Sequence, residues 1–226
     1  MKLVYKNIEY ILKLEEDKIP VYIIENQKLF FTMLNDFYRQ ITENLEGNFK
    51  LFDDKNKELS ISKNFLLVSD IFSINFQEKK IISSVFSSLK EESMKENIYS
   101  LRLEMENILK GFLENLISDF EFPLELNEKF EYDNLFKIFN IRIQENYGSF
   151  LEKLVDYLKI IQKLTTIRYV VFINLKTFLS KEEVEELYKE CFYRKINIIL
   201  FENYDNNCII ENEKRIIIDS DLCEIF

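Results

Sequence analysis

The chain has 226 residues, and 47% of them are hydrophobic, which is enough to fill the core of a folded domain and excludes a mainly disordered protein. It has no histidine and only three glycines, which excludes His-based triads, His-containing zinc sites, haem ligation by His and glycine-rich phosphate loops. The 30 basic and 40 acidic residues give a net charge of -10, which argues against a nucleic-acid or anionic-membrane partner unless basic side chains gather on a local surface.

The first third of the chain alternates predicted strands with one helix. Strands are predicted within 8–26, at 49–53 and at 64–70, and an amphipathic helix is predicted over 27–45. Gly47 is the expected C-terminal cap of this helix. The last strand is apolar on both faces and ends in Asp70, so we expect it to be central in a mainly parallel sheet.

A long helical pattern follows over 77–118, with an expected break near Ser93. It carries apolar residues at heptad spacing: Met94, Ile98, Leu101, Met105, Ile108 and Phe112. A second helix is predicted over 150–166, with Leu151, Leu154, Leu158 and Ile161 on one face. The two seams predict an antiparallel helical leg.

Between these helices lies a small insert, for which we expect an extended 121–126, a short helix over 133–139 and a strand at 141–144. The return segment reads as strand, helix, strand and strand, at 168–175, after Ser180, at 197–204 and at 215–219. Ser180 is the predicted N-cap, with Glu183 completing a capping box. The pattern predicts an α/β fold: a mainly parallel-sheet head, 1–76 plus 167–226, interrupted by a leg, 77–166, with an acidic insert at 119–147.

The three cysteines, Cys191, Cys208 and Cys223, form neither a CxxC motif nor an even disulfide framework, as is typical of reduced thiols. No segment approaches the roughly 20 apolar residues that cross a bilayer, and the N-terminus lacks a signal-peptide core. We therefore expect a cytoplasmic protein without a membrane partner.

Two blocks of sequence carry a resemblance to a known family. These are KLFDDKNKELSISKNFLLVSDIFSIN (50–75) and FLEKLVDYLKIIQKLTTIRYVVFINLKTFLSKEEVEELYKECFYRKINIILFE (150–202). They resemble the Csn-type family, the small accessory adaptation proteins of type II-A CRISPR systems, and the weaker likeness extends over essentially the whole chain. The resemblance implies a head like a degenerate P-loop NTPase, no enzymatic activity, and a calcium-supported homotetrameric ring. It further implies that the ring threads double-stranded DNA ends without reading sequence during spacer acquisition, with the CRISPR integrase and effector nuclease of its operon as partners.

The residues themselves also argue against nucleotide hydrolysis. The predicted strand-to-helix junction, Glu25 to Lys28, contains no glycine, so it offers no cradle of backbone N–H groups for phosphates. Lys28 is either a substitute phosphate lysine or, as we favour, a solvated lysine at a helix start. Asp70 stands where a magnesium-binding aspartate ends a strand in active NTPases, but a structural role is favoured. No catalytic residue is predicted.

The acidic insert is the candidate metal site, with Asp119, Glu121, Glu125, Glu128, Glu131 and Asp133 within fifteen residues. Calcium takes six to eight oxygen ligands, and in an extended segment Glu121 and Glu125 would share a face. The residues alone favour a solvated acidic surface. The family resemblance implies calcium here, with Asp119, Glu121, Glu125, Glu128 and Asp133 as the predicted ligands.

Lys137, Arg142, Lys159 and Lys163 are the candidate DNA contacts. Taken alone they are ordinary partners of neighbouring glutamates, and no interleaved aromatic residues indicate stacked single strands. The resemblance implies a ring lumen lined by basic side chains, which would reconcile DNA binding with an acidic exterior. Two alternatives remain open: a degenerate but active NTPase working through Lys28 and Asp70, and a cytosolic scaffold without a nucleic-acid role.

Overall fold

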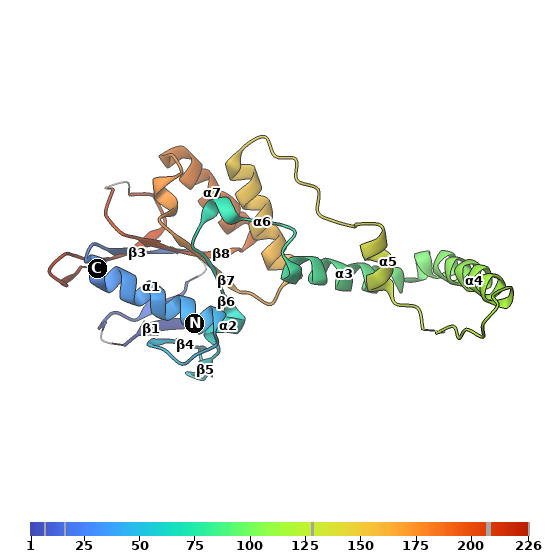
Figure 1. Cartoon of the computed structure of the whole chain (residues 1–226). Coiled ribbons are helices and arrows are strands. Elements are labelled where there is room, and N and C mark those ends of the chain that lie inside the picture. The colour runs from blue at the N-terminus through green and yellow to red at the C-terminus, as the bar shows by residue number, and fades with distance from the viewer. Residues whose placement is uncertain (7, 16, 128, 207–208, 226) are drawn as a thin grey trace. The chain divides into compact units, whose positions relative to one another are not determined.

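The computed structural model describes residues 1–6, 8–15, 17–127, 129–206 and 209–225 (Figure 1). It divides into two compact units, Met1–Asn75 with Asn146–Phe226, and Phe76–Glu145. The strands are β1 (Lys2–Tyr5), β2 (Leu12–Lys13), β3 (Ile19–Ile24), β4 (Phe49–Phe52), β5 (Glu58–Leu59), β6 (Phe65–Val68), β7 (Tyr169–Ile173), β8 (Asn197–Glu202), β9 (Glu213–Ile218) and β10 (Glu224–Ile225). The helices are α1 (Gln27–Thr42), α2 (Ile61–Asn64), α3 (Lys79–Ser93), α4 (Glu96–Ser118), α5 (Tyr132–Ile138), α6 (Phe150–Leu164) and α7 (Lys181–Arg194), with 3-10 helices η1 (Ile71–Ser73) and η2 (Leu175–Thr177).

The first unit is built on a six-stranded sheet with the order β10-β9-β3-β8-β7-β6. All neighbours are parallel except β10, which is antiparallel to β9. This confirms an α/β fold with parallel strands. The central position expected for the strand at 64–70 is wrong, because β6 is the edge strand and β3, buried at every residue, lies between β9 and β8. An apolar strand needs cover on both faces, which helices provide at a sheet edge as well as at its centre.

A second sheet in the same unit is antiparallel, with the order β2-β1-β4-β5. It lies with α1 on one face of the main sheet, while α6 and α7 lie on the other (Figure 1). The ring of Phe37 in α1 packs edge-on against two others. Its centroid lies 4.7 Å from that of Phe49 in β4 and 5.3 Å from that of Phe65 in β6. A single aromatic core therefore joins α1 to both sheets.

Helix α1 ends earlier than Gly47, so the expected glycine cap is wrong. Its C-cap is Glu43, and Asn44 takes the left-handed conformation, with φ of 52°. A Cβ at Gly47 would lie 2.6 Å from the side chain of Gln40. That buried amide donates to the Phe49 carbonyl at 2.9 Å and accepts from the Phe49 N–H at 3.0 Å. The lack of a side chain at Gly47 therefore leaves room for the Gln40 amide to hydrogen-bond the backbone of Phe49 at the start of β4.

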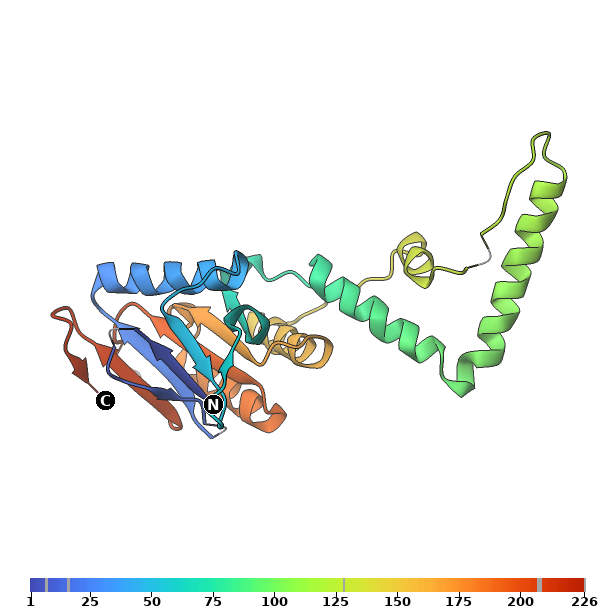
Figure 2. The same ribbon diagram turned by 90° about the horizontal axis from the view of Figure 1, so that it is seen from below.

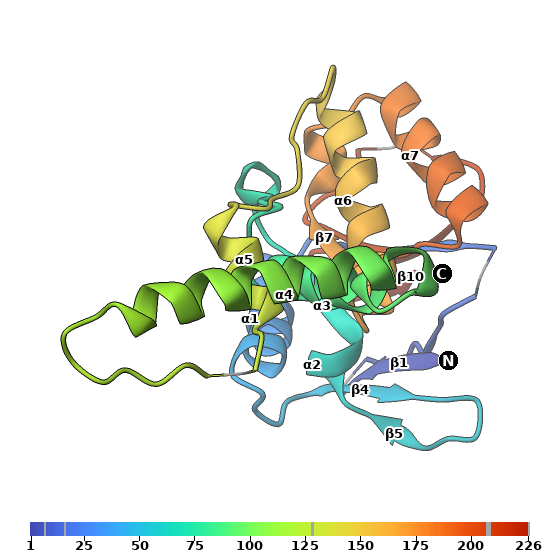
Figure 3. The same cartoon turned by 90° about the vertical axis from the view of Figure 1, so that its right-hand side faces the viewer.

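Helix α6 belongs to the first unit, which differs from the leg predicted over 77–166. It lies beside α7 (Figure 3), and its apolar face is buried. The buried residues are Leu151, Leu154, Val155, Tyr157, Leu158 and Ile161. The same three-and-four spacing serves a coiled-coil seam and a helix packed on a sheet, so the sequence pattern could not separate them.

The second unit contains α3, α4 and α5. The predicted break near Ser93 is confirmed, because α3 ends there and α4 begins at Glu96, turning away from α3 (Figure 2). Phe86, Tyr132 and Phe136 form a small core between α3 and α5. Residues 141–144 form no strand. Within the described ranges, no helix is both long enough and apolar enough to cross a membrane.

Candidate functional site

The junction between β3 and α1 is closed by its own side chains. Asn26 is the N-cap of α1, and its Oδ1 accepts from the Leu29 N–H at 3.0 Å. Its amide also donates to the Ser220 carbonyl at 2.9 Å. Only Glu25 and Asn26 separate the strand from the helix, and Lys28 is exposed. This geometry supports a solvated Lys28 and offers no loop that could wrap a phosphate.

Asp70 has a local structural role. Its Oδ1 accepts from the Phe72 N–H at 2.9 Å, and its carbonyl accepts from the Ser73 hydroxyl at 2.7 Å. The carboxylate therefore caps η1 directly after β6. This arrangement agrees with the structural reading of Asp70.

The acidic insert does not gather into a metal site in the described chain. Asp119, Glu121, Glu125 and Asp133 are exposed, and Glu128 lies outside the described residues. Residues 121–126 form no strand, so the shared face expected of Glu121 and Glu125 has no regular backbone to support it. Among described residues, no three acidic or sulfur-bearing groups are placed to hold one ion. The described carboxylates of one chain therefore do not fit a complete calcium site.

Glu131, the remaining acidic residue of the insert, has a partner. Its carboxylate lies 2.9 Å from the Lys129 ammonium, and this contact lowers the pKa of Glu131. Both side chains are largely exposed, so the pair contributes little to stability. Glu131 is therefore neutralised locally, whereas Asp119, Glu121 and Glu125 form no ion pair with a described residue.

The four candidate DNA contacts fall in both units. Lys137, in the last turn of α5, and Arg142 belong to the second unit, and both are exposed. Lys159 and Lys163 lie on α6 in the first unit. The Lys159 ammonium lies 2.5 Å from a carboxylate oxygen of Asp156, whereas the other three form no ion pair within the described part of the chain. Three of the four cations are therefore available to an external anion.

A buried charge pair in the first unit was missed by sequence reasoning. The Lys176 ammonium lies 2.6 Å from Glu213 Oε1, and the Tyr188 hydroxyl donates to the same oxygen at 2.7 Å. The two charged side chains are 5% and 1% exposed. These residues come from η2, α7 and β9, so only the folded chain brings them together. No local sequence pattern could have identified the pair.

Glu202, at the end of β8, lies beside this pair. Its Oε1 accepts from the Lys176 backbone N–H at 3.1 Å. Burial is the main cause that raises the pKa of Glu202 to about 7. The head thus encloses one lysine and two glutamates under α7 and η2.

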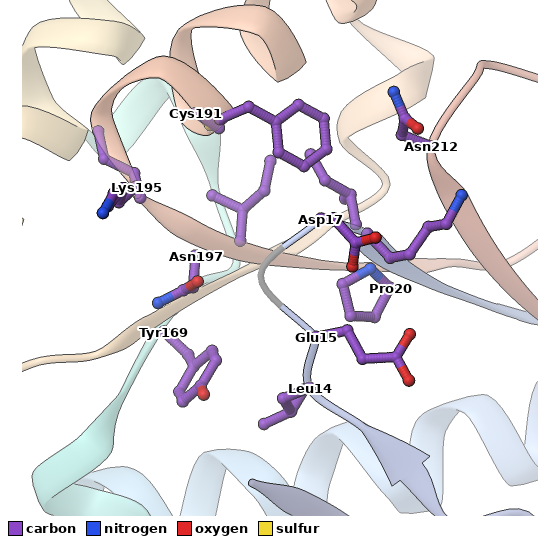
Figure 4. A pocket seen from close by; sticks show the side chains of 14 residues that line it. Leu14, Glu15, Asp17, Pro20, Tyr169, Cys191, Lys195, Asn197 and Asn212 are labelled. Carbon is purple, nitrogen blue, oxygen red and sulfur yellow. The ribbon is translucent and has the colours of Figure 1, made fainter.

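A cavity of about 510 Å³ opens at the amino-terminal ends of β3 and β8 (Figure 4). Pro20, Tyr169, Asn197 and Cys191 are among its lining residues. Burial raises the pKa of the Cys191 thiol to about 12, so it is not a nucleophile at neutral pH. Open parallel sheets bind ligands at the carboxyl ends of their strands, which is the opposite edge. The cavity is therefore not the expected ligand site of such a sheet.

Comparison with known proteins gives a consistent set of matches. A family model described as CRISPR-associated protein (Cas_Csn2) matches residues 40–222, from the last turn of α1 through β9. A protein of Streptococcus agalactiae named CRISPR-associated protein Csn2 is 25% identical over 170 residues, covering 73% of this chain and 72% of the relative. A protein of the same name from Enterococcus faecalis is 20% identical over 207 residues, covering 91% and 90%. The matches span both units.

Proposed function

The chain belongs to the Csn2 family of CRISPR-associated proteins, and on this premise we propose that it binds the ends of double-stranded DNA during spacer acquisition. In this proposal it acts in the cytoplasm as a non-catalytic, sequence-independent clamp within CRISPR-based defence. It assembles as a homotetrameric ring and works with the integrase and effector nuclease of its operon. The family membership supports the CRISPR role, and the cations, the exposed face of α4 and the β3–α1 junction support the rest of the proposal.

Two unpaired cations of the second unit support the proposed binding of DNA. Lys137 and Arg142 are exposed, lie five residues apart and form no ion pair with a described residue. In a chain of net charge -10, cations left without carboxylate partners are an available anion-binding feature. A ring repeats them around one axis, which concentrates positive charge in its lumen.

The exposed seam of α4 supports self-association. No described residue of this 23-residue helix is buried. Leu101, Ile108 and Phe112 are 65%, 64% and 59% exposed, although they repeat at heptad spacing. Covering such a stripe with another subunit would remove apolar surface from water.

The β3–α1 junction supports the non-catalytic part and the likeness to a degenerate P-loop head. An active nucleotide loop presents several backbone N–H groups to phosphate. Here the side chain of Asn26 caps the helix, and no glycine lies between β3 and α1. Here β3 leads into α1 without a phosphate loop, as the proposed degenerate head requires.

Calcium remains part of the proposal through the acidic residues of the insert. The predicted ligands are Asp119, Glu121, Glu125, Glu128 and Asp133. The described carboxylates of a single chain do not form the site. We confine the proposed role of calcium to stabilising the insert and the assembly.

A mobility-shift comparison tests the proposal. Linear duplex should bind and small closed circles should not, because a closed ring must be threaded from an end. With ~6 to 10 phosphates neutralised, raising salt from 50 to 200 mM should weaken binding by about 10³ to 10⁵. Lys137→Glu with Arg142→Glu should abolish the shift while the tetramer mass by light scattering is unchanged.

The matched control is Lys63→Glu with Lys189→Glu, which makes the same change in charge at exposed positions of α2 and α7. It should bind linear duplex to within a few-fold of the unmodified protein. Equal binding of circles and linear duplex would overturn the threaded ring. Full binding by the Lys137 and Arg142 variant would overturn the residue assignment.

A further inference from the structure

The small antiparallel sheet presents lysines on its outward face. Along β1, β2 and β4, inward residues such as Leu3, Leu12 and Leu51 are fully buried. The alternate positions are exposed or half-buried, and they include Lys2, Lys13 and Lys50. Because side chains alternate across a strand, these three lysines share one face of the sheet. We call them the lysine face.

The register places these lysines close together. Lys2 pairs directly with Lys13 on the neighbouring strand. Lys2 also pairs with Phe52 on β4, which makes Lys50 its diagonal neighbour. Directly opposite residues have Cβ atoms about 4.5 to 5.5 Å apart, and diagonal neighbours lie about 7 to 8 Å apart. Like charges directly opposite destabilise a sheet, so the Lys2–Lys13 pair costs stability unless an anion compensates it.

The carboxylates around this face are already engaged. Asp54 lies 2.9 Å from the amino group of Met1, and Glu58 lies 2.8 Å from the ammonium of Lys50. Neither Lys2 nor Lys13 forms an ion pair with a described residue. Lys2 instead donates to the side-chain oxygen of Asn56 at 3.3 Å.

The turn between β4 and β5 adds two further lysines. Asp53 Oδ1 accepts the backbone N–H groups of Lys55 and Lys57 at 2.9 and 2.8 Å, so this carboxylate holds the turn. Both lysine side chains are exposed and unpaired among the described residues. The four strands and this turn carry five lysines and the N-terminal amine against three carboxylates, within a chain of net charge -10.

We propose that the lysine face, with Lys55 and Lys57, is a second DNA-contact surface that binds the phosphate backbone of the duplex. This inference rests on the proposed function, which identifies duplex DNA as the polyanion that the face binds. The face contains no arginine for bidentate recognition, so it suits point contacts with phosphates rather than the reading of base edges. Such contacts hold the duplex without sequence preference.

The test uses the full chain and a 30-base-pair linear duplex, titrated at several salt concentrations. Lys2→Gln, Lys13→Gln and Lys50→Gln are combined in one variant. We expect affinity to fall about tenfold or more, and the salt slope to fall by about one for each lysine that contacts phosphate. The matched control combines Lys63→Gln, Lys181→Gln and Lys189→Gln, which should leave both quantities within a few-fold of the unmodified protein.

A single substitution separates binding from folding. Lys13→Glu replaces the repulsive pair with an opposite-charge pair across from Lys2, so its melting temperature should rise. Its affinity for the duplex should fall at the same time. A variant that is more stable yet binds more weakly cannot owe its weaker binding to misfolding.

The outcomes distinguish the two proposals. If the unmodified protein does not shift the duplex, the proposed function and this inference both fail. If it does and the triple lysine-face variant binds like its matched control, only the inference fails. Polyglutamate is a second probe: loss of polyglutamate binding by the triple variant with full retention of duplex binding would overturn the inference in favour of an acidic protein partner.

Discussion

The buried pair of Lys176 and Glu213 permits a quantitative prediction. In Lys176→Met, the Glu213 carboxylate keeps its hydrogen bond from Tyr188 but loses the ammonium 2.6 Å away. The Glu213 side chain is only 1% exposed, so water cannot replace the lost ammonium. Its second oxygen, Oε2, already has no hydrogen-bond partner among described residues. Removing one member of a buried ion pair typically costs about 3 to 5 kcal/mol. Since domains are stable by only about 5 to 15 kcal/mol, this loss is a large fraction of the total.

Urea unfolding followed by circular dichroism measures the effect as a lower midpoint at an unchanged slope. The double variant Lys176→Met with Glu213→Gln removes the stranded charge, so it should recover about 2 kcal/mol or more of the loss. Glu190→Gln is a suitable control, because its ion pair with Arg194 is about one third exposed and should contribute about 1 kcal/mol or less. A loss below about 1 kcal/mol in Lys176→Met, or a double variant no more stable than the single one, would refute the reasoning.

Three further predictions concern the pH, the metal and α1. Burial raises the pKa of Glu202 to about 7 from its ordinary 4.5. The protonated carboxyl therefore contributes its full stabilisation below pH 4.5, and about 3 kcal/mol of stability is lost as the pH rises through 7. In urea unfolding, Glu202→Gln should be more stable than the unmodified protein at pH 8 but not at pH 4.5. Chelating calcium should lower the melting temperature, and Glu121→Gln with Glu125→Gln should reproduce that shift in calcium; an unchanged melt on chelation would remove the metal. Gly47→Ala should cost about 1 to 3 kcal/mol, because its Cβ displaces the buried Gln40 from its two hydrogen bonds, and an unchanged urea midpoint would contradict this.

Two local features of the fold and its α/β class followed from the sequence, whereas the cap of α1 and the places of β6 and α6 did not. The capping box of Ser180 and Glu183 is present as predicted, because both of its bonds join neighbouring residues. The break after Ser93 was similarly visible. The edge position of β6 and the place of α6 in the first unit depend on elements far away in the chain. The spacing of apolar residues along a helix predicts how wide its buried face is, but it does not predict which element packs against that face.

The candidate site divides in the same way. Lys137 and Arg142 could be selected as cations, and the structure shows that described carboxylates leave them unpaired. The lysine face was not visible, because β1 lacked a predicted strand and the contact between Lys2 and Lys13 depends on its register. Charge counted along a sequence does not reveal charges brought together by strand pairing.

The lack of any buried described residue in α4 has a consequence for the order in which the protein gains structure. In proteins most of the stability of a helix comes from packing its apolar face against other elements, so α4 has little stability of its own without apolar cover. If partner subunits provide that cover, completion of this helix is thermodynamically coupled to protein concentration. Amide hydrogens of α4 should then exchange within the least protected cooperative unit at high dilution and become slower as subunits associate, whereas those of β3 should keep the protection of the core.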